Sequence, residues 1–158
     1  MSEFHFIEKQ YLGLNRMSLA RRISLSILCF SAYYWRVNHD KSGDLYFFIG
    51  IAIMVISIIL MFILHFKTKI KNESIILDGL WTSRKIKISL TSIKSVKKIK
   101  YSKYLLNRSV YNLHVNGRIR FYTRGYDAVE LIDHDGLIYL IGSQKAEELV
   151  RVIQKKII

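Results

Sequence analysis

Apolar and polar positions divide the chain into a first part of long apolar runs and a second part of short alternating segments. Residues 45–66 contain no Asp, Glu, Lys or Arg, and a helix of that length, rising about 1.5 Å per residue, crosses the roughly 30 Å hydrocarbon core of a bilayer. An earlier apolar run, residues 23–35, is bracketed by arginines, whose side chains can snorkel to the interface. The pattern predicts a transmembrane hairpin over residues 19–66, with spans at about 19–37 and 45–66.

Basic residues gather at both outer ends of this hairpin: Lys9, Arg16, Arg21 and Arg22 lie before or just inside its start, and Lys67, Lys69 and Lys71 follow its end. Cytoplasmic flanks of membrane helices carry an excess of basic residues. We therefore expect a multi-pass membrane protein with both termini in the cytoplasm.

Residues 1–18 carry a further pattern. Phe4, Ile7, Tyr11 and Leu14 recur at steps of three and four, which is the spacing of one face of a helix. The spacing predicts a cytoplasmic amphipathic segment that either lies in the membrane interface or docks on a partner or on the cytoplasmic domain.

From residue 72 onward, short alternating runs lie between turn residues. The pairs Asp78-Gly79, Asn116-Gly117 and Asp135-Gly136 favour the positive φ angles of tight hairpin turns. The runs around them predict seven strands, at residues 73–77, 80–88, 94–102, 109–115, 118–124, 127–133 and 137–142. Because each strand has one apolar face, the strands require a sheet-on-sheet core.

The chain closes on an amphipathic helix. Ser143 is a suitable N-cap, and the residues that follow it at steps of three and four are Ala146, Leu149, Val150, Ile153 and Ile157. The fold class predicted is an α+β membrane protein, in which a two-helix transmembrane hairpin precedes a domain at residues 67–158. This domain is a seven-stranded β-sandwich or partly open barrel capped by the C-terminal helix.

Residues 72–156 resemble the pleckstrin-homology (PH) fold in this order of strands and helix. The pattern of residues at Asp78-Gly79-Leu80 and at positions 88–96 (ISLTSIKSV) is similar to that of bacterial PH-like domains, some of which follow two membrane helices. The resemblance implies a bacterial inner-membrane protein with a PH-like binding or scaffolding module. In eukaryotic relatives a long, basic first hairpin loop holds phosphoinositide headgroups. Asp78-Gly79 predicts a tight hairpin here, which argues against inositol-phosphate recognition.

Charge is as segregated as hydropathy in this chain of 158 residues with a net charge of +13. Residues 67–125 hold 15 Lys and Arg against Glu73 and Asp78, whereas residues 126–158 hold four basic and six acidic residues. One part of the β domain is therefore strongly cationic and suits an anionic partner.

Two basic sets are candidates for docking or for binding an anionic surface: Arg118, Arg120, Tyr122 and Arg124 on one strand face, and Lys67, Lys69 and Lys71 after the second span. Arg and aromatic groups bind phosphate and stack on bases, although a solvated strand face is the simpler reading. The three lysines attract anionic lipid at a leaflet or only follow the positive-inside rule. An acidic protein surface is favoured over nucleic acid, because no recognition motif is present and a membrane tether limits access.

No constellation for catalysis, a metal or a cofactor is found. The five histidines are scattered, the single Cys29 lies in an apolar run, and Asp133-His134-Asp135 reads as a hairpin tip. We therefore expect a non-enzymatic, membrane-anchored binding or scaffolding protein, an accessory or regulatory subunit of a larger membrane complex. Its expected partners are membrane lipids and other membrane-protein subunits, with no small-molecule substrate. The alternative is an anionic-lipid or nucleic-acid binding module at the cytoplasmic membrane surface.

Overall fold

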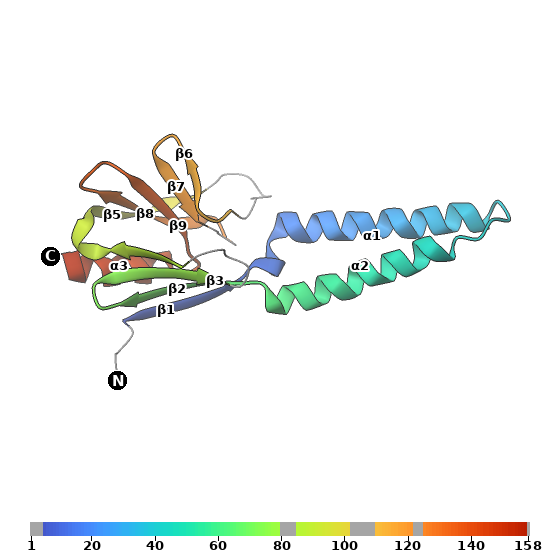
Figure 1. Ribbon diagram of the computed structural model, residues 1–158, viewed down its shortest axis with the longest axis horizontal. Coiled ribbons are helices and arrows are strands. Elements are labelled where there is room, and N and C mark those ends of the chain that lie inside the picture. Colours follow the sequence, from blue (N-terminus) through green and yellow to red (C-terminus); the bar gives the residue numbers. More distant parts are fainter. Residues whose placement is uncertain (1–4, 80–84, 102–109, 122–124, 158) are drawn as a thin grey trace.

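A helical hairpin projects from one end of a β domain in the computed structural model, which describes residues 5–79, 85–101, 110–121 and 125–157 (Figure 1). The elements are β1 (Phe6–Tyr11), η1 (Leu12–Leu14), α1 (Arg16–Val37), α2 (Asp44–Ile63), β2 (His65–Lys71), β3 (Ser74–Gly79), β4 (Ile86–Ser89), η2 (Leu90–Ser92), β5 (Ile93–Lys100), β6 (Leu113–Val115), β7 (Arg118–Phe121), β8 (Asp127–Asp133), β9 (Ile138–Gly142) and α3 (Ala146–Ile157). The fold is α+β, with two helices near the N-terminus and one at the C-terminus.

The two predicted helices of the hairpin are present and pack side by side (Figure 1). Among the described residues, α2 is the one helix both long enough and apolar enough to span a membrane. Its 20 residues span about 30 Å, and Gly50 is the residue of α2 that is buried. The 22-residue helix α1 is long enough but carries four arginines: Arg16, Arg21, Arg22 and Arg36.

The helical spacing read before the hairpin is wrong, because residues 6–11 form strand β1. Of the alternatives for this segment, docking on the β domain is the one observed. This strand pairs antiparallel with β2, from Phe6 opposite Ile70 to Tyr11 opposite His65. Phe6, Glu8 and Gln10 point inward and are buried, so two of the three inward positions are polar. Because Glu8 and Gln10 are polar although buried, the residues of β1 do not alternate between apolar and polar as those of a half-buried strand usually do. The apolar residues of the segment happen to have the spacing of a helix face.

Sheet A has the strand order β1-β2-β3-β4 and is antiparallel throughout. Strand β2 contradicts the predicted end of the second span, because α2 ends at Ile63 and residues 65 and 66 already belong to the strand. The lysines of β2 lie where the sequence predicts only a basic membrane flank. The two-residue turn between β2 and β3 is Asn72-Glu73, with φ of 45° and 55°.

The tight turn predicted at Asp78-Gly79 is wrong. Strand β3 continues through both residues, which pair with Lys67 and Phe66 of β2. Leu77 then pairs with Ile86 of β4, so this connection is longer than two residues. Residues 80–84 of the predicted strand 80–88 lie outside the described part of the chain.

Sheet B has the order β5-β8-β9-β7-β6, in which β7 and β9 are parallel and the other neighbours antiparallel. The predicted turn at Asn116-Gly117 is confirmed, with φ of 51° and 70°. Gly136, at φ 82°, closes the β8–β9 hairpin as expected. With β1 and β2, the described residues form nine strands rather than the seven predicted.

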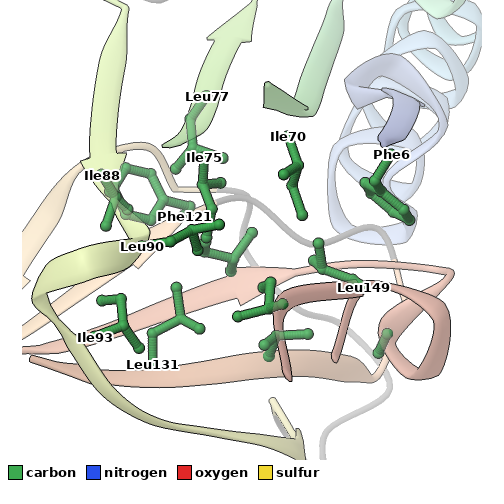
Figure 2. Close-up of a cluster of buried hydrophobic side chains, with 14 of the residues drawn as sticks. Phe6, Ile70, Ile75, Leu77, Ile88, Leu90, Ile93, Phe121, Leu131 and Leu149 are labelled. Atoms are coloured by element: carbon green, nitrogen blue, oxygen red, sulfur yellow. The ribbon is translucent and has the colours of Figure 1, made fainter. Parts of the chain in front are cut away.

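The hydrophobic core lies between the two sheets and under α3 (Figure 2). Sheet A contributes Ile70, Ile75 and Leu77, and sheet B contributes Phe121 and Leu131, all fully buried. On α3, Leu149 and Ile153 are fully buried as predicted. The expected sheet-on-sheet core with a C-terminal helix packed on it is confirmed.

Candidate docking surfaces and the base of the hairpin

Five lysines lie on the outer side of sheet A, and we call them the lysine face: Lys9, Lys67, Lys69, Lys71 and Lys87. They share this side because the inward residues of β2, Phe66, Thr68 and Ile70, are fully buried and successive side chains of a strand alternate. The five lysines come from three of the four strands, β1, β2 and β4. Lys67 lies opposite Lys9, and Ile76 lies between Lys69 and Lys87.

The lysine face concentrates positive charge. Lys9 and Lys67 are direct cross-strand neighbours, an arrangement that destabilises a sheet when both residues carry the same charge. Burial, followed by the charge of Lys67, lowers the pKa of Lys69. Asp78 lies beside Lys67 and forms an ion pair with Lys85 at 3.8 Å. The positive field left on this side of the sheet attracts anionic groups.

The three lysines of β2 lie at different distances from the hairpin. Strand β2 leads away from α2 (Figure 1), and each residue of a strand adds about 3.3 Å. Lys71 is therefore roughly 13 Å further from the hairpin than Lys67, more than the roughly 8 Å over which salt screens a charge.

The arginine set predicted on β7 is described only in part. Arg118 is exposed and Arg120 is partly buried, whereas Tyr122 and Arg124 lie outside the described residues. Phe121, of the opposite side, is fully buried, so the expected alternation is confirmed there. The Arg120 Nε atom is buried and has no hydrogen-bond partner within the described chain. Burial raises the pKa of Tyr101, and the charge of Arg120 opposes that rise.

The two basic sets lie on different sheets, the lysines on sheet A and the arginines on sheet B. Sequence reasoning missed that Lys9 and Lys87 join Lys67, Lys69 and Lys71. The sequence signal for Lys9 is that Ile7 and Lys9 alternate with Phe6, Glu8 and Gln10, as in a strand. That Lys9 lies beside Lys67 follows only from the pairing of β1 with β2, a strand about 60 residues further along the chain.

The base of the hairpin is locked by backbone contacts around Gly13 and Arg22. The Arg22 guanidinium donates to the carbonyl oxygens of Gly13 at 2.6 Å and Ser57 at 3.2 Å, while its Nε donates to that of Ser18 at 3.0 Å. A Cβ atom at Gly13 would overlap the backbone of Leu60, so only glycine allows this approach. The chain entering α1 is thereby fixed against the last turns of α2.

A groove of about 330 Å³ runs between α1 and α2. Its lining is almost wholly apolar, with Arg22 and the two serines as its polar residues: Leu19, Arg22, Ile23, Ser26, Ile27, Phe30, Met54, Ser57, Ile58 and Met61. Beyond the groove, the Phe30 ring packs on Gly50, and Phe47 contacts both Phe30 and Tyr33 with ring centroids 6.0 and 5.3 Å apart. The aromatic packing closes the groove toward the loop between the helices.

A buried polar clasp ties β1 to the start of α3. One Glu8 carboxylate oxygen accepts from the Ser143 hydroxyl at 2.5 Å, and the other accepts from the Gln144 N–H at 2.7 Å. The Gln10 side-chain amide donates to the Gly142 carbonyl at 2.7 Å. Burial is the largest effect on Glu8 and raises its pKa, against these hydrogen bonds, which lower it. Through this clasp, the inward polar side chains of β1, Glu8 and Gln10, have hydrogen-bond partners.

No group of three His, Cys, Asp or Glu within the described ranges could hold a metal ion. Asp133-His134-Asp135 forms the predicted hairpin tip, where the Asp133 carboxylate accepts from the His134 N–H. In comparisons with family models, curated proteins and solved structures, nothing matches the chain.

Proposed function

We propose that the chain is a non-enzymatic scaffold anchored in the bacterial cytoplasmic membrane, an accessory or regulatory subunit of a larger membrane complex. Its hairpin crosses the bilayer, and both termini and a PH-like domain lie in the cytoplasm. The observation that carries this proposal is the base of the hairpin, where β1 leads into α1 and α2 leads into β2 through the contacts of Gly13 and Arg22. An anchor built in this way sets the orientation of the domain at the membrane.

The apolar surface of the hairpin supports membrane insertion. Leu45, Phe48 and Phe62 of α2 are 68%, 66% and 72% exposed, and Leu28 of α1 is 67% exposed. Apolar surface of this extent costs about 25 cal/mol for each Å² left in water. A bilayer or the helices of partner subunits would remove that cost.

The arginines of α1 are compatible with a second span. Arg22 lies level with Ser57, six residues or about 9 Å before the end of α2, and its N–H groups are already bound to carbonyl oxygens. Arg36, at the other end, donates to the Ser42 carbonyl at 2.7 Å. The residues between these two arginines are uncharged, and charge near span ends is tolerated through snorkelling.

The direction of sheet A favours a protein partner for the lysine face. Strands β1 and β2 run lengthwise in the same long direction as the hairpin (Figure 1). The lysine face would then stand along the membrane normal rather than lie flat on a leaflet. An acidic surface of a neighbouring subunit, standing beside the domain, can meet all five lysines, whereas headgroups can reach only those nearest the hairpin.

Site-directed labelling tests the topology. In a Cys29→Ser background, single cysteines replace Ser42 and Gln154, both of which are exposed. An impermeant maleimide should label Ser42→Cys from outside intact cells and Gln154→Cys only after the membrane is opened. Both positions labelled from the same side would contradict the hairpin.

Purification of the tagged full-length protein in mild detergent tests the scaffold function. We expect a membrane subunit at fixed stoichiometry, lost when Lys9, Lys67 and Lys87 are all changed to Gln. A matched control removes the same charge at three exposed lysines elsewhere on the domain, Lys94, Lys100 and Lys155, and should keep the partner. A further triple variant, Arg118, Arg120 and Arg124 to Gln, tests the arginine set separately. Turnover of a substrate by the purified protein would contradict a non-enzymatic role.

A further inference from the structure

The groove between α1 and α2 has the length of half a bilayer rather than of a helix–helix contact. On α1 it runs from Leu19 to Phe30, which is about 16 Å at 1.5 Å per residue. One leaflet contributes about 15 Å of hydrocarbon. On α2 the groove residues run from Met54, at the middle of the helix, to Met61, and the packing of Phe30 on Gly50 lies beyond them toward the loop. An object filling the groove would therefore lie mostly in the half next to the β domain.

The end of the groove nearest the β domain is cationic. Arg22 lines the groove itself. Arg16 lies seven residues, or two helical turns, before the groove residue Ile23 and therefore on the same side of α1. Its guanidinium is held in place by the Tyr126 hydroxyl at 2.7 Å and lies over that ring at 5.5 Å. Arg21, by contrast, lies roughly 160° around the helix from Ile23.

We propose that this groove binds one acyl chain of an anionic phospholipid of the leaflet facing the domain, with the phosphate held beside Arg16. The groove supplies an apolar slot of one-leaflet length, and Arg16, at the first residue of α1, supplies a positive charge at the depth where headgroups lie. A partner helix would need contact along the full 30 Å or so of the hairpin, but the groove ends at Phe30, after about 16 Å of α1. The site would make the hairpin base sensitive to anionic lipid.

The inference rests on the proposed membrane insertion, and its test separates the two. Full-length protein is placed in nanodiscs containing phosphatidylglycerol and phosphatidylcholine, one of the two carrying a photoactivatable group near the acyl-chain end. After illumination, peptide mass spectrometry locates the cross-links. We expect phosphatidylglycerol to mark groove residues near Phe30 and Met54 in preference to phosphatidylcholine.

Two matched pairs of variants sharpen this test. Ile27→Trp places a large side chain in the groove and should abolish the preferential cross-link, whereas Leu28→Trp, at a neighbouring position outside the groove lining, should not. Arg16→Gln should lower the preference for phosphatidylglycerol about fivefold, the equivalent of about 1 kcal/mol for one basic group near the surface. Arg21→Gln removes the same charge from the other side of α1 and should leave the preference unchanged.

Three results would overturn the lipid site. One is equal labelling of the groove and of the Leu28 side, another is equal labelling by both lipids, and the third is cross-linking of the groove to a second copy of the chain in place of lipid. If alkaline carbonate instead extracts the protein from membranes, membrane insertion itself is contradicted, and the lipid site with it. A protein that resists carbonate but labels evenly contradicts the lipid site alone.

Discussion

Helix α3 buries its apolar side chains in the protein, whereas helix α2 leaves its apolar side chains exposed. Of the 20 residues of α2, only Gly50 is buried. In the 12-residue α3, Ala146, Leu149 and Ile153 are buried, and acidic residues lie at its first turn and lysines at its last. The number of apolar residues therefore does not decide whether a helix packs on the protein, whereas their period does. An apolar stripe can face a core, and a helix that is apolar all round needs lipid or other helices.

This contrast implies that the stability of the β domain and the proposed membrane anchoring by the hairpin are separable. The core lies between the sheets and α3 (Figure 2), and its buried residues do not include those of α2. Substitutions in one region should then leave the other unchanged, except at the base of the hairpin, where Gly13 and Arg22 join the two.

The largest effect is expected at Leu149, which is fully buried under sheet B. Leu149→Ala should lower the unfolding free energy by about 2–5 kcal/mol, through lost apolar burial and a residual cavity. Thermal or denaturant unfolding of the full-length protein in detergent measures this, and Gln154→Ala on the exposed side should change little. Membrane fractionation of Leu149→Ala should match that of the wild type. Equal losses at positions 149 and 154 would contradict the packing of α3.

The converse change is Val55→Lys in the middle of α2, where the side chain is 49% exposed. A lysine at the centre of a span costs about 2.5–3.5 kcal/mol of insertion free energy. We expect the protein to become extractable by alkaline carbonate, while unfolding of the β domain stays unchanged. Val55→Leu is the control. Unaltered membrane retention of Val55→Lys would show that α2 does not meet hydrocarbon.

A smaller effect is expected at the clasp, which tests whether β1 belongs to the domain rather than to the anchor. Glu8→Ala removes the acceptor of the Ser143 hydroxyl and the Gln144 N–H. Leaving such buried donors without partners costs about 1–3 kcal/mol, which should appear as a lowered unfolding free energy. Exposed Lys9→Ala on the same strand should cost less. An unchanged unfolding free energy for Glu8→Ala would place β1 outside the cooperative unit.

The clasp also predicts a direction for pH dependence. Because burial raises the pKa of Glu8 above 4.5, protonation is favoured by folding. The protonation of Glu8 adds its full contribution to the unfolding free energy below pH 4.5, and this contribution is lost as pH rises through the raised pKa of folded Glu8. Comparison with Glu8→Gln, which does not titrate, isolates it. The unfolding free energy of the wild type minus that of the variant should fall with rising pH, and a rise would contradict this assignment.

The smallest effect concerns two hairpin turns of the same backbone class. Asn72-Glu73 and Asn116-Gly117 both have positive φ at both residues, but glycine occupies the second position only in the latter. Glu73→Gly should raise the unfolding free energy by about 0.5–1 kcal/mol, since the strain of a left-handed residue exceeds the entropy that glycine adds to the unfolded chain. Gly117→Glu should lower it by a similar amount. Opposite signs would show that side-chain contacts of Glu73 outweigh its backbone strain.

The turns also show how far local sequence signals reach. Asn116-Gly117 forms the predicted turn, whereas Asp78-Gly79 is strand because β3 is paired with β2 through both residues. Asn72-Glu73 turns although its second residue has no preference for positive φ. In each case the register of the flanking strands decided which residues had to turn. The sequence predicts one basic set of Lys67, Lys69 and Lys71 and another of Arg118, Arg120, Tyr122 and Arg124, but only the pairing of sheet A shows that Lys9 and Lys87 lie with the lysines.

The sequence by itself determined the elements whose pattern is unbroken over several helical turns: the uncharged α2 and the striped α3. Only the tertiary structure decided that residues 6–11 are a strand. Their inward Glu8 and Gln10 find hydrogen-bond partners at Ser143, Gln144 and Gly142, more than 130 residues away. The parallel pairing of β7 with β9 is equally non-local. Local patterns record which side of an element prefers water, but a buried polar side chain is stabilised only by the partner that meets it.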